Sequence, residues 1–312
     1  MSSPGCTGRR SIPATVRAGR TTTKGVHVRE DFAVAQATAA DWDEIVEWCA
    51  QEGWNPGLGD AACFRPTDPA GFLVGRLGGR VVSAVSVVTY SPDFAFLGFY
   101  LVHPDHRGTG LGMATWKAAL PHAEGRVIGL DAVPEQRPNY ERSGFAAAYD
   151  NVRYTGRPRG GDAASGAEAV RSVTPYHLDA ISAYDSGCFP AERHAFLSRW
   201  LTAEGHVARV LLDEAGHVTG YGVIRPAVQG LRVGPLFADT EQGAAALFDA
   251  LTAGLPAEAE VCVDVPDHHA AATALAESRG LAPAARFTRM YTGPAPYARL
   301  DATYATTTLE LG

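Results

Sequence analysis

The sequence predicts an α/β (α+β) fold that is built twice along the chain. Its 312 residues allow about two domains of ordinary size. Similar segments recur at nearly constant offsets: VHP at 102–104 is followed 131 residues later by VGP at 233–235, and YTG at 154–156 recurs 137 residues later at 291–293. Each copy predicts the order strand, helix, several strands, helix, strand, helix, strand. This repetition indicates a tandem duplication.

Each predicted element has a local signal in the sequence. Thr38 and Thr174 precede amphipathic segments and suit the cap of a helix, and Pro175 suits a first helical position. RLGGRVVSAVSVV (76–88) and LDEAGHVTGYGVI (212–224) both predict a hairpin turn followed by a strand. FAFLGFYLV (94–102) predicts a buried strand, residues 111–120 and the segment after Thr240 predict helices, and TTTLELG (306–312) predicts a last strand. The buried face predicted for the first helix consists of Trp42, Ile45, Val46 and Cys49.

Composition and charge exclude several classes of function. Hydrophobic residues make up 46% of the chain, yet no run reaches the roughly 18 apolar residues that a membrane helix needs. The net charge of −7 argues against broad nucleic-acid binding. Five scattered cysteines without a CxxC pair predict reduced thiols and no metal site, and the absence of a signal-like apolar block predicts a cytoplasmic protein.

Polar and glycine-rich stretches predict the domain boundaries. Residues 1–30 are basic with few large apolar groups, which predicts a disordered tail, either merely solvated or steering an anionic partner. We expect a first domain over 31–156, a Gly/Ser/Ala-rich linker over 157–168 and a second domain over 169–312.

A glycine-rich turn, HPDHRGTGLGMATW at 103–116, separates the predicted strand 94–102 from the next helix. Gly108, Gly110 and Gly112 permit sharp backbone turns, and the amides at the helix start favour an anion. The stretch matches neither the P-loop GxxxxGK[ST] nor the dinucleotide fingerprint GxGxxG, because Thr115 stands where the third glycine would fall. By itself the turn is either a phosphate site or an ordinary glycine turn.

The surrounding residues make the turn more specific. Val102, Pro104 and Arg107 precede the glycines, and a Y-x-x-x-G-F stretch follows at 140–145. This arrangement resembles the Gcn5-related N-acetyltransferase (GNAT) superfamily, and GWNPGLGDA (53–61), FLGFYLV (96–102) and NYERSGF (139–145) resemble its tandem branch. The resemblance covers roughly residues 32–312. It implies two tandem GNAT folds, each a mixed, centrally splayed β-sheet flanked by helices.

The resemblance also implies a donor site in the first copy. Acetyl-CoA or another short acyl-CoA would bind where two parallel strands splay apart, with its pyrophosphate on the glycine turn. The residues that carry this expectation are Tyr100, Leu101, Val102, Arg107, Gly108, Thr109, Gly110, Leu111, Gly112 and Asn139.

Tyr140 occupies the position of the general acid that protonates the departing thiolate in many relatives, although an aromatic packing role is the alternative. Some relatives carry a glutamate six residues before the valine, but this chain has Phe96 there, so the base must come from elsewhere or act through water. Asp131 is the first choice, and a turn or cap role is its alternative. His103, His106, Asp60 and Asp93 are weaker candidates.

The second copy retains the architecture but not the chemistry. Aligning the VHP and VGP segments places Ala238 and Glu241 at glycine-turn positions, and Ala276 at the tyrosine position. A carboxylate there would repel a pyrophosphate. We therefore expect one donor site per chain, with the second copy as a degenerate GNAT-like domain that walls the acceptor pocket.

Four residues are the candidate acceptor contacts. Asp185 and Arg193 lie in YDSGCFPAERHAFLSRW (184–200), which resembles a recurring stretch of this branch; an ion pair within the domain is their alternative. Trp54 and Asn55 follow the first helix, where they border the acceptor cleft or simply pack.

Together these features predict a GNAT-type, acyl-CoA-dependent N-acyltransferase that moves an acyl group to the amine of a small molecule by direct attack in a ternary complex. The alternatives are a non-catalytic acyl-CoA sensor and a transferase of the same fold that takes its acyl group from a carrier protein or an aminoacyl-tRNA. We expect no metal, no membrane and no nucleic-acid partner, and a monomer, with a dimer as the alternative.

Overall fold

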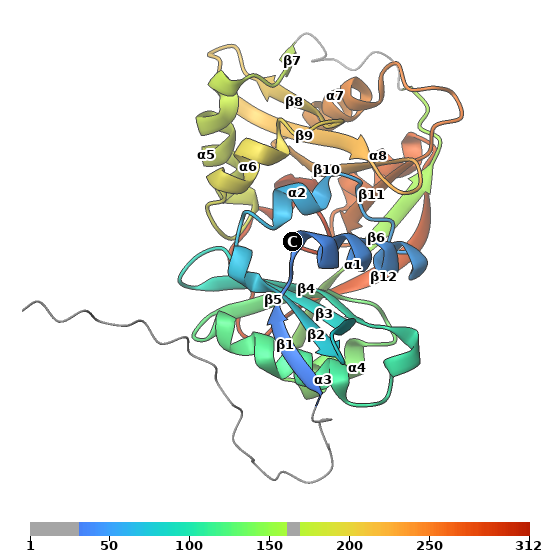
Figure 1. Cartoon of the computed structure of the whole chain (residues 1–312). Helices are drawn as coiled ribbons and strands as arrows, with labels where there is room; N and C mark the ends of the chain where they lie inside the picture. The colour runs from blue at the N-terminus through green and yellow to red at the C-terminus, as the bar shows by residue number, and fades with distance from the viewer. Residues whose placement is uncertain (1–30, 161–168) are drawn as a thin grey trace, which may run out of the picture.

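A computed structural model describes residues 31–160 and 169–312 (Figure 1). The predicted tail over 1–30 and residues 161–168 of the predicted linker lie outside this range. In Figure 1 the N-terminal half lies below and the C-terminal half above, and the C-terminus ends at the centre between them. No helix in the described ranges is long and apolar enough to cross a membrane.

The first half follows the predicted order of elements. Its strands and helices are β1 (Phe32–Gln36), α1 (Ala39–Gln51), α2 (Asp60–Phe64), β2 (Phe72–Leu77), β3 (Arg80–Thr89), β4 (Phe94–Val102), α3 (Leu111–Ala119), β5 (Val127–Ala132), α4 (Arg137–Arg142) and β6 (Ala146–Gly156). Short 3-10 turns lie at Pro69–Gly71, Pro104–His106 and Leu120–Ala123.

The second half repeats this order and adds one short strand. Its elements are β7 (Val170–Ser172), α5 (Leu178–Cys188), α6 (His194–Trp200), β8 (Val207–Leu212), β9 (Val218–Pro226), β10 (Leu231–Ala238), α7 (Glu241–Thr252), β11 (Val261–Pro266), α8 (Ala270–Ser278), β12 (Ala282–Tyr291) and β13 (Thr303–Ala305). Pro175–His177 and Leu300–Ala302 form 3-10 turns.

The local signals act as predicted. Thr38 begins α1 through a capping box: its side chain accepts the backbone N–H of Asp41, and the Asp41 carboxylate accepts the N–H of Thr38. Gly78 and Gly79 both have positive φ and make the tight turn between β2 and β3. Thr240 caps α7 by accepting the N–H of Gly243.

The two halves exchange equivalent strands. The sheet order is β1-β2-β3-β4-β5-β12-β6-β11-β10-β9-β8-β7, so β12 of the second half pairs with β5 of the first. In return β6, the equivalent strand of the first half, pairs with β11 of the second. The mixed, helix-flanked sheets predicted for the two copies are therefore joined into one sheet, and each half is completed by a strand of the other.

The joined sheet splays at the centre of each half, as the fold prediction requires. Residues 94–96 of β4 pair in parallel with 127–129 of β5, and residues 231–233 of β10 pair in parallel with 261–263 of β11. Beyond these three-residue pairings the strands of each parallel pair separate. In the second half β13 fills the opening, because it pairs with β10 on one side and the Thr306 N–H donates to the Asp264 carbonyl of β11 on the other.

The prediction for the last segment was wrong. TTTLELG (306–312) is not a strand; the strand is β13, and residues 306–312 continue as an irregular, fully buried chain. This segment runs from the second opening toward the first. It is buried because both halves pack around it, although nothing in its own pattern is typical of a core element.

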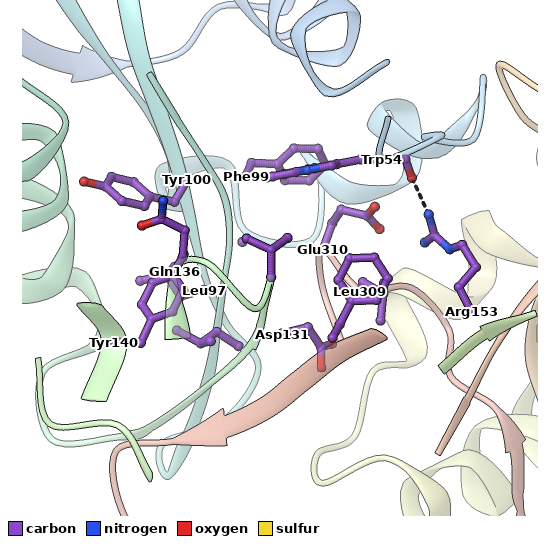
Figure 2. Close-up of a pocket in the computed structure, with 14 residues that line it drawn as sticks. Trp54, Leu97, Phe99, Tyr100, Asp131, Gln136, Tyr140, Arg153, Leu309 and Glu310 are labelled. Atoms are coloured by element: carbon purple, nitrogen blue, oxygen red, sulfur yellow. Dashed lines mark hydrogen bonds between the residues drawn. The ribbon is translucent and has the colours of Figure 1, made fainter. Parts of the chain in front are cut away.

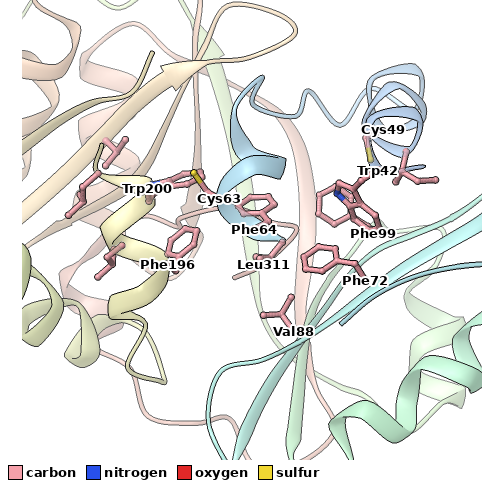
Figure 3. Packing of buried hydrophobic residues seen from close by; sticks show 14 of the residues in the cluster. Trp42, Cys49, Cys63, Phe64, Phe72, Val88, Phe99, Phe196, Trp200 and Leu311 are labelled. Carbon is pink, nitrogen blue, oxygen red and sulfur yellow. The ribbon is translucent and has the colours of Figure 1, made fainter. Parts of the chain in front are cut away.

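A shared core joins the halves where α2 meets α6 (Figure 3). The ring of Phe64 on α2 stacks on the indole of Trp200 with centroids 5.7 Å apart. Beside it, the fully buried Arg225 binds Asp60 with its Nε 2.7 Å from Oδ1. Asp60 thus forms an ion pair between the two halves. Its carboxylate is not free, which contradicts its place among the candidate bases.

Candidate active site

The glycine turn between β4 and α3 depends on all three glycines. Gly108 and Gly110 have φ of +74° and +85°, a region that side chains with a Cβ rarely occupy. Gly112 is needed for another reason: a Cβ there would overlap the side chain of Val102. The turn therefore brings the start of α3 directly against the end of β4.

The start of α3 has the properties of an anion site. Gly110 occupies the cap position and offers no side-chain acceptor, so the N–H groups of the first turn remain unpaired within the helix. Arg107 is fixed nearby: its Nε donates to the carbonyl of Val102 at 3.1 Å, and its guanidinium also pairs with Glu52, the residue that follows α1. The Thr109 hydroxyl donates to the His106 carbonyl and closes the turn.

A cavity lies where β4 and β5 separate (Figure 2). The cavity together with its mouth spans about 590 Å³, part of which is open solvent. Its walls come from both halves and from the final segment, and are formed by Trp54, Leu97, Gly98, Phe99, Tyr100, Leu130, Asp131, Val133, Gln136, Tyr140, Arg153, Phe287, Leu309 and Glu310. Aromatic and aliphatic groups dominate this lining, so the cavity suits a compact, largely apolar molecule.

A β-bulge shapes the β4 wall of the cavity. Ala84 pairs with Leu101 and Ser86 with Gly98, so Phe99 and Tyr100 together face Val85. Phe99 adopts a positive φ of 48°, which is strained for an aromatic residue. Of the predicted donor-binding residues on this strand, Tyr100 lines the cavity, Leu101 is buried in the core, and the Val102 carbonyl already accepts a hydrogen bond from Arg107.

Tyr140 extends into the cavity from α4. Its ring packs on Trp116 with centroids 5.6 Å apart, and its carbonyl accepts the N–H of Phe145. Burial raises the pKa of Tyr140 well above its usual value of 10, so its hydroxyl carries a proton throughout the neutral range. The packing role and the acid role proposed from the sequence are therefore compatible. Asn139, its neighbour, is exposed and bonds to Gln136.

Asp131 lines the cavity, but its carboxylate is already paired. Arg289, its cross-strand partner on β12, donates from Nε to Oδ1 at 2.9 Å and from Nη2 to Oδ2 at 2.8 Å, and Asn151 also donates to Oδ1. Burial raises its pKa, against the lowering effect of Arg289. The same guanidinium lies over the ring of Phe96. This geometry favours a structural role for Asp131 over that of a base.

The sequence analysis missed Glu310, a second carboxylate in the cavity. Its side chain is 5% exposed; Oε1 lies 3.3 Å from Nη1 of Arg232, whereas Oε2 has no hydrogen-bond partner among the described residues. The only sequence signal was an acidic residue in an otherwise apolar closing segment. In the view of Figure 2, Glu310 lies between Trp54 and Leu309.

The predicted acceptor residues divide into two groups. Trp54 lines the cavity, and its carbonyl accepts from Arg153. Asn55 instead joins the halves by pairing with the backbone of Gln229. Asp185 and Arg193 are not part of the cavity lining. They form a buried, bidentate ion pair with both N–O distances at 2.8 Å, so the alternative of an ion pair within the domain is the one observed.

The remaining weaker candidates lie away from the cavity. His103 accepts the N–H of Asp105 in the 3-10 turn, and the carbonyl of Asp93 accepts the N–H of Val127. Among the described residues, no group of three or more histidine, cysteine or acidic side chains is arranged to hold a metal ion.

The structure corrects the alignment of the second copy. Pro235 does not follow β10 but lies within it, two residues beyond the last parallel pair, which is the register position of Gly98 in β4. Only Asp239 and Thr240 separate β10 from α7, so the glycine turn has no counterpart rather than a degenerate one. Ala276 does correspond to Tyr140, because Leu281 donates to its carbonyl as Phe145 donates to that of Tyr140.

Comparison with known proteins agrees with this architecture. The description "Acetyltransferase (GNAT) family" matches residues 39–145, and "Acetyltransferase (GNAT) domain" matches residues 181–305. A holothin acyltransferase from Pseudoalteromonas sp. is 32% identical over 277 residues, covering 88% of this chain and 93% of the relative. An uncharacterized N-acetyltransferase of Bacillus subtilis, YitH, is 24% identical and covers 72% of this chain and 79% of its own length.

Solved structures share the fold. A Pyrococcus horikoshii protein described as an acetyltransferase aligns with a TM-score of 0.75 at 18% identity, covering 94% of this chain and 99% of its own. A tandem GNAT protein from the clavulanic acid biosynthesis pathway aligns with a TM-score of 0.58 at 17% identity, covering 85% and 99%. The chain is an acyltransferase that belongs to the tandem branch of the Gcn5-related N-acetyltransferase superfamily.

Proposed function

We propose that this enzyme transfers an acyl group, most simply acetyl, from acyl-CoA to the amine of a small molecule. The observation that supports this proposal is a continuous path in the first half. The unpaired N–H groups of α3, the open edge of β4 beyond Phe96 and the side chain of Tyr140 border the same opening in the sheet. The second half has no equivalent path, because β13 fills its opening.

The donor would bind along this path. The N–H groups of residues 108–112 would hold the pyrophosphate, with Arg107 as the adjacent cation. Beyond Phe96, β4 lacks a partner on the β5 side, so its backbone groups can pair with the extended amide-bearing arm of the donor. Asn139, exposed on α4, would border the entrance.

The cavity residues would carry out the transfer. Acyl-CoA supplies the activated thioester. A neutral amine forms the C–N bond as the C–S bond breaks, the Tyr140 hydroxyl gives its proton to the sulfur, and the proton that the nitrogen loses restores the phenol. The apolar lining excludes water and thereby limits hydrolysis of the thioester.

The acceptor would be a compact amine. The cavity walls are mainly aromatic and aliphatic, and the second half contributes Phe287, Leu309 and Glu310, which would make it the acceptor wall. The 32% identical relative is named for acylation of holothin, so holothin is the first acceptor to test. Asp185, Arg193 and Asn55 would act indirectly in this arrangement, because they position the final segment and the interface.

The proposal includes a monomeric, cytoplasmic enzyme. The exchange of β6 and β12 completes both sheets within one chain, so no second copy is needed to complete the site. Cys49, Cys63, Cys188 and Cys262 are buried free thiols, as expected in a reducing compartment.

Calorimetry with acetyl-CoA tests the donor, and release of the CoA thiol in the presence of holothin tests the reaction. We expect one acetyl-CoA per chain and thiol release that depends on holothin. Failure to bind acetyl-CoA or a longer acyl-CoA would reject the donor and favour an acylated carrier protein. Binding without thiol release would reject holothin alone.

A further inference from the structure

The final segment connects the two openings of the sheet. Residues 303–305 fill the opening between β10 and β11, and the following residues run to β4 of the first half. There the backbone of Glu310 passes so close to Gly98 that a Cβ on Gly98 would overlap its carbonyl oxygen. Gly98 lies where β4 has separated from β5, two residues past the last pair between these strands. The segment thus places Glu310 where the acyl group of a bound donor would lie.

Glu310 has an unsatisfied oxygen at this position. Glu310 is only 5% exposed. Its Oε1 faces Arg232, and its Oε2 has no hydrogen-bond partner among the described residues. A buried carboxylate oxygen without a donor costs free energy, so its retention indicates a ligand with a donor group. The cavity that Glu310 lines offers the space for that ligand.

The charged side chains around Glu310 are paired with one another. Asp264 binds Arg153 through Nε at 2.7 Å and Arg232 through Nη2 at 2.8 Å. Arg232 therefore divides its charge between Asp264 and Glu310, and its bond to Glu310 is the longer one at 3.3 Å. Arg289 is neutralised separately by Asp131. Arg153, Arg232 and Arg289 thus each face a carboxylate, and none of these three offers an unopposed positive charge to an anionic substrate.

We propose that Oε2 of Glu310 binds the ammonium group of the acceptor and removes its proton, so that the neutral amine can attack the thioester. The inference rests on the proposed function and sharpens it. The proton passes from nitrogen to Oε2 and then to solvent, and the second proton, lost as the C–N bond forms, follows the route through Tyr140 described above. The acceptor class is a primary amine on an apolar or aromatic body, with no acidic group next to the nitrogen.

Two CoA thioethers test this inference without knowledge of the natural acceptor. S-(3-aminopropyl)-CoA carries an ammonium group where the attacking amine would lie, and S-butyl-CoA is its neutral, nearly isosteric match. In the wild-type enzyme we expect the aminopropyl compound to bind about tenfold more tightly or better, since a charge-assisted hydrogen bond contributes at that level. In Glu310→Gln the two affinities should become equal within about twofold.

The controls separate the two levels of the proposal. Glu258→Gln changes an exposed glutamate of the second half in the same way and should retain the wild-type preference. Equal affinities for the two thioethers in the wild-type enzyme, or a preference that persists in Glu310→Gln, would overturn the role of Glu310. Failure of both thioethers and of acetyl-CoA to bind would overturn the CoA donor itself, and this inference with it.

Discussion

The two openings of the sheet have the same strand geometry and opposite contents. Between β4 and β5 the strands separate around a cavity that a ligand can enter, whereas between β10 and β11 the chain inserts its own strand, β13. The first opening begins at a glycine turn with unpaired amides; the second continues through two residues into a helix capped by Thr240. One opening thus holds a cavity, and the other holds the strand that anchors the segment leading to that cavity.

The strand that fills the second opening explains how the two halves differ. The buried polar groups of an unused opening must find partners, and a strand of the same chain provides them permanently. Anchoring that strand also fixes the direction of residues 306–312, so the second half supplies Leu309 and Glu310 to the cavity of the first.

The largest expected effect tests the chemistry of the first opening. Tyr140→Phe should lower kcat about 100-fold or more, because the proton donor to the leaving thiolate is lost. The affinity for acetyl-CoA should change by no more than about twofold, since the ring still packs on Trp116. Steady-state thiol release and calorimetry measure the two quantities.

Tyr176→Phe is the matched control, because Tyr176 is 96% exposed in the second half. It should leave both quantities unchanged. An unaltered kcat in Tyr140→Phe would reduce that residue to the packing role.

The next effect tests the glycine turn. Gly110→Glu should raise the Kd of acetyl-CoA about 100-fold, because a Cβ is strained at φ +85° and a carboxylate would occupy the anion site. Gly216→Glu is a matched control: Gly216 has φ +86°, lies in a turn of the second half and has open space around its Cβ position. It should lower the free energy of unfolding while acetyl-CoA binds normally. Equal losses of affinity in both variants would place the donor elsewhere.

Asp264, on the strand β11 beside the filled opening, should stabilise the fold against acid. Burial alone raises the pKa of Asp264, but Arg153 and Arg232 outweigh it and lower that pKa from the usual 3.8 to about 2. A depressed carboxyl pKa stabilises the fold above the unfolded pKa, and the contribution is lost as pH falls from about 4 to about 2. Its size is about 2 kcal/mol.

Urea unfolding at a series of pH values measures this contribution as the difference between wild type and Asp264→Asn. Asp179→Asn, at a 97% exposed side chain, is the control and should reproduce the wild-type curve. Parallel curves for wild type and Asp264→Asn between pH 4 and 2 would contradict the prediction.

The smallest effect concerns the helix that replaced the glycine turn. Thr240→Ala removes the hydroxyl that accepts the Gly243 N–H, and should lower the free energy of unfolding by about 1 kcal/mol in a urea titration. Acetyl-CoA affinity should not change. A weaker affinity would mean that the second half contributes directly to the donor site.

Elements with local causes could be predicted from the sequence. The strand β4 spans the predicted residues 94–102, α3 starts at the predicted Leu111, and Thr38 and Thr240 cap their helices, because capping, turn geometry and apolar periodicity act over a few neighbouring residues. The tandem fold followed from the spacing of the repeats, and the glycine turn was found with its three glycines.

The contacts between distant segments became known from the folded structure. The exchange of β6 and β12 pairs Asp131 with Arg289 across 158 residues, which turns a candidate base into an ion-pair partner. The insertion of β13 carries Glu310 into a cavity of the other half, and the register of β10 moves Pro235 inside a strand. Strand pairing depends on which edges are left open once the halves have packed, and no local pattern in TTTLELG records that choice.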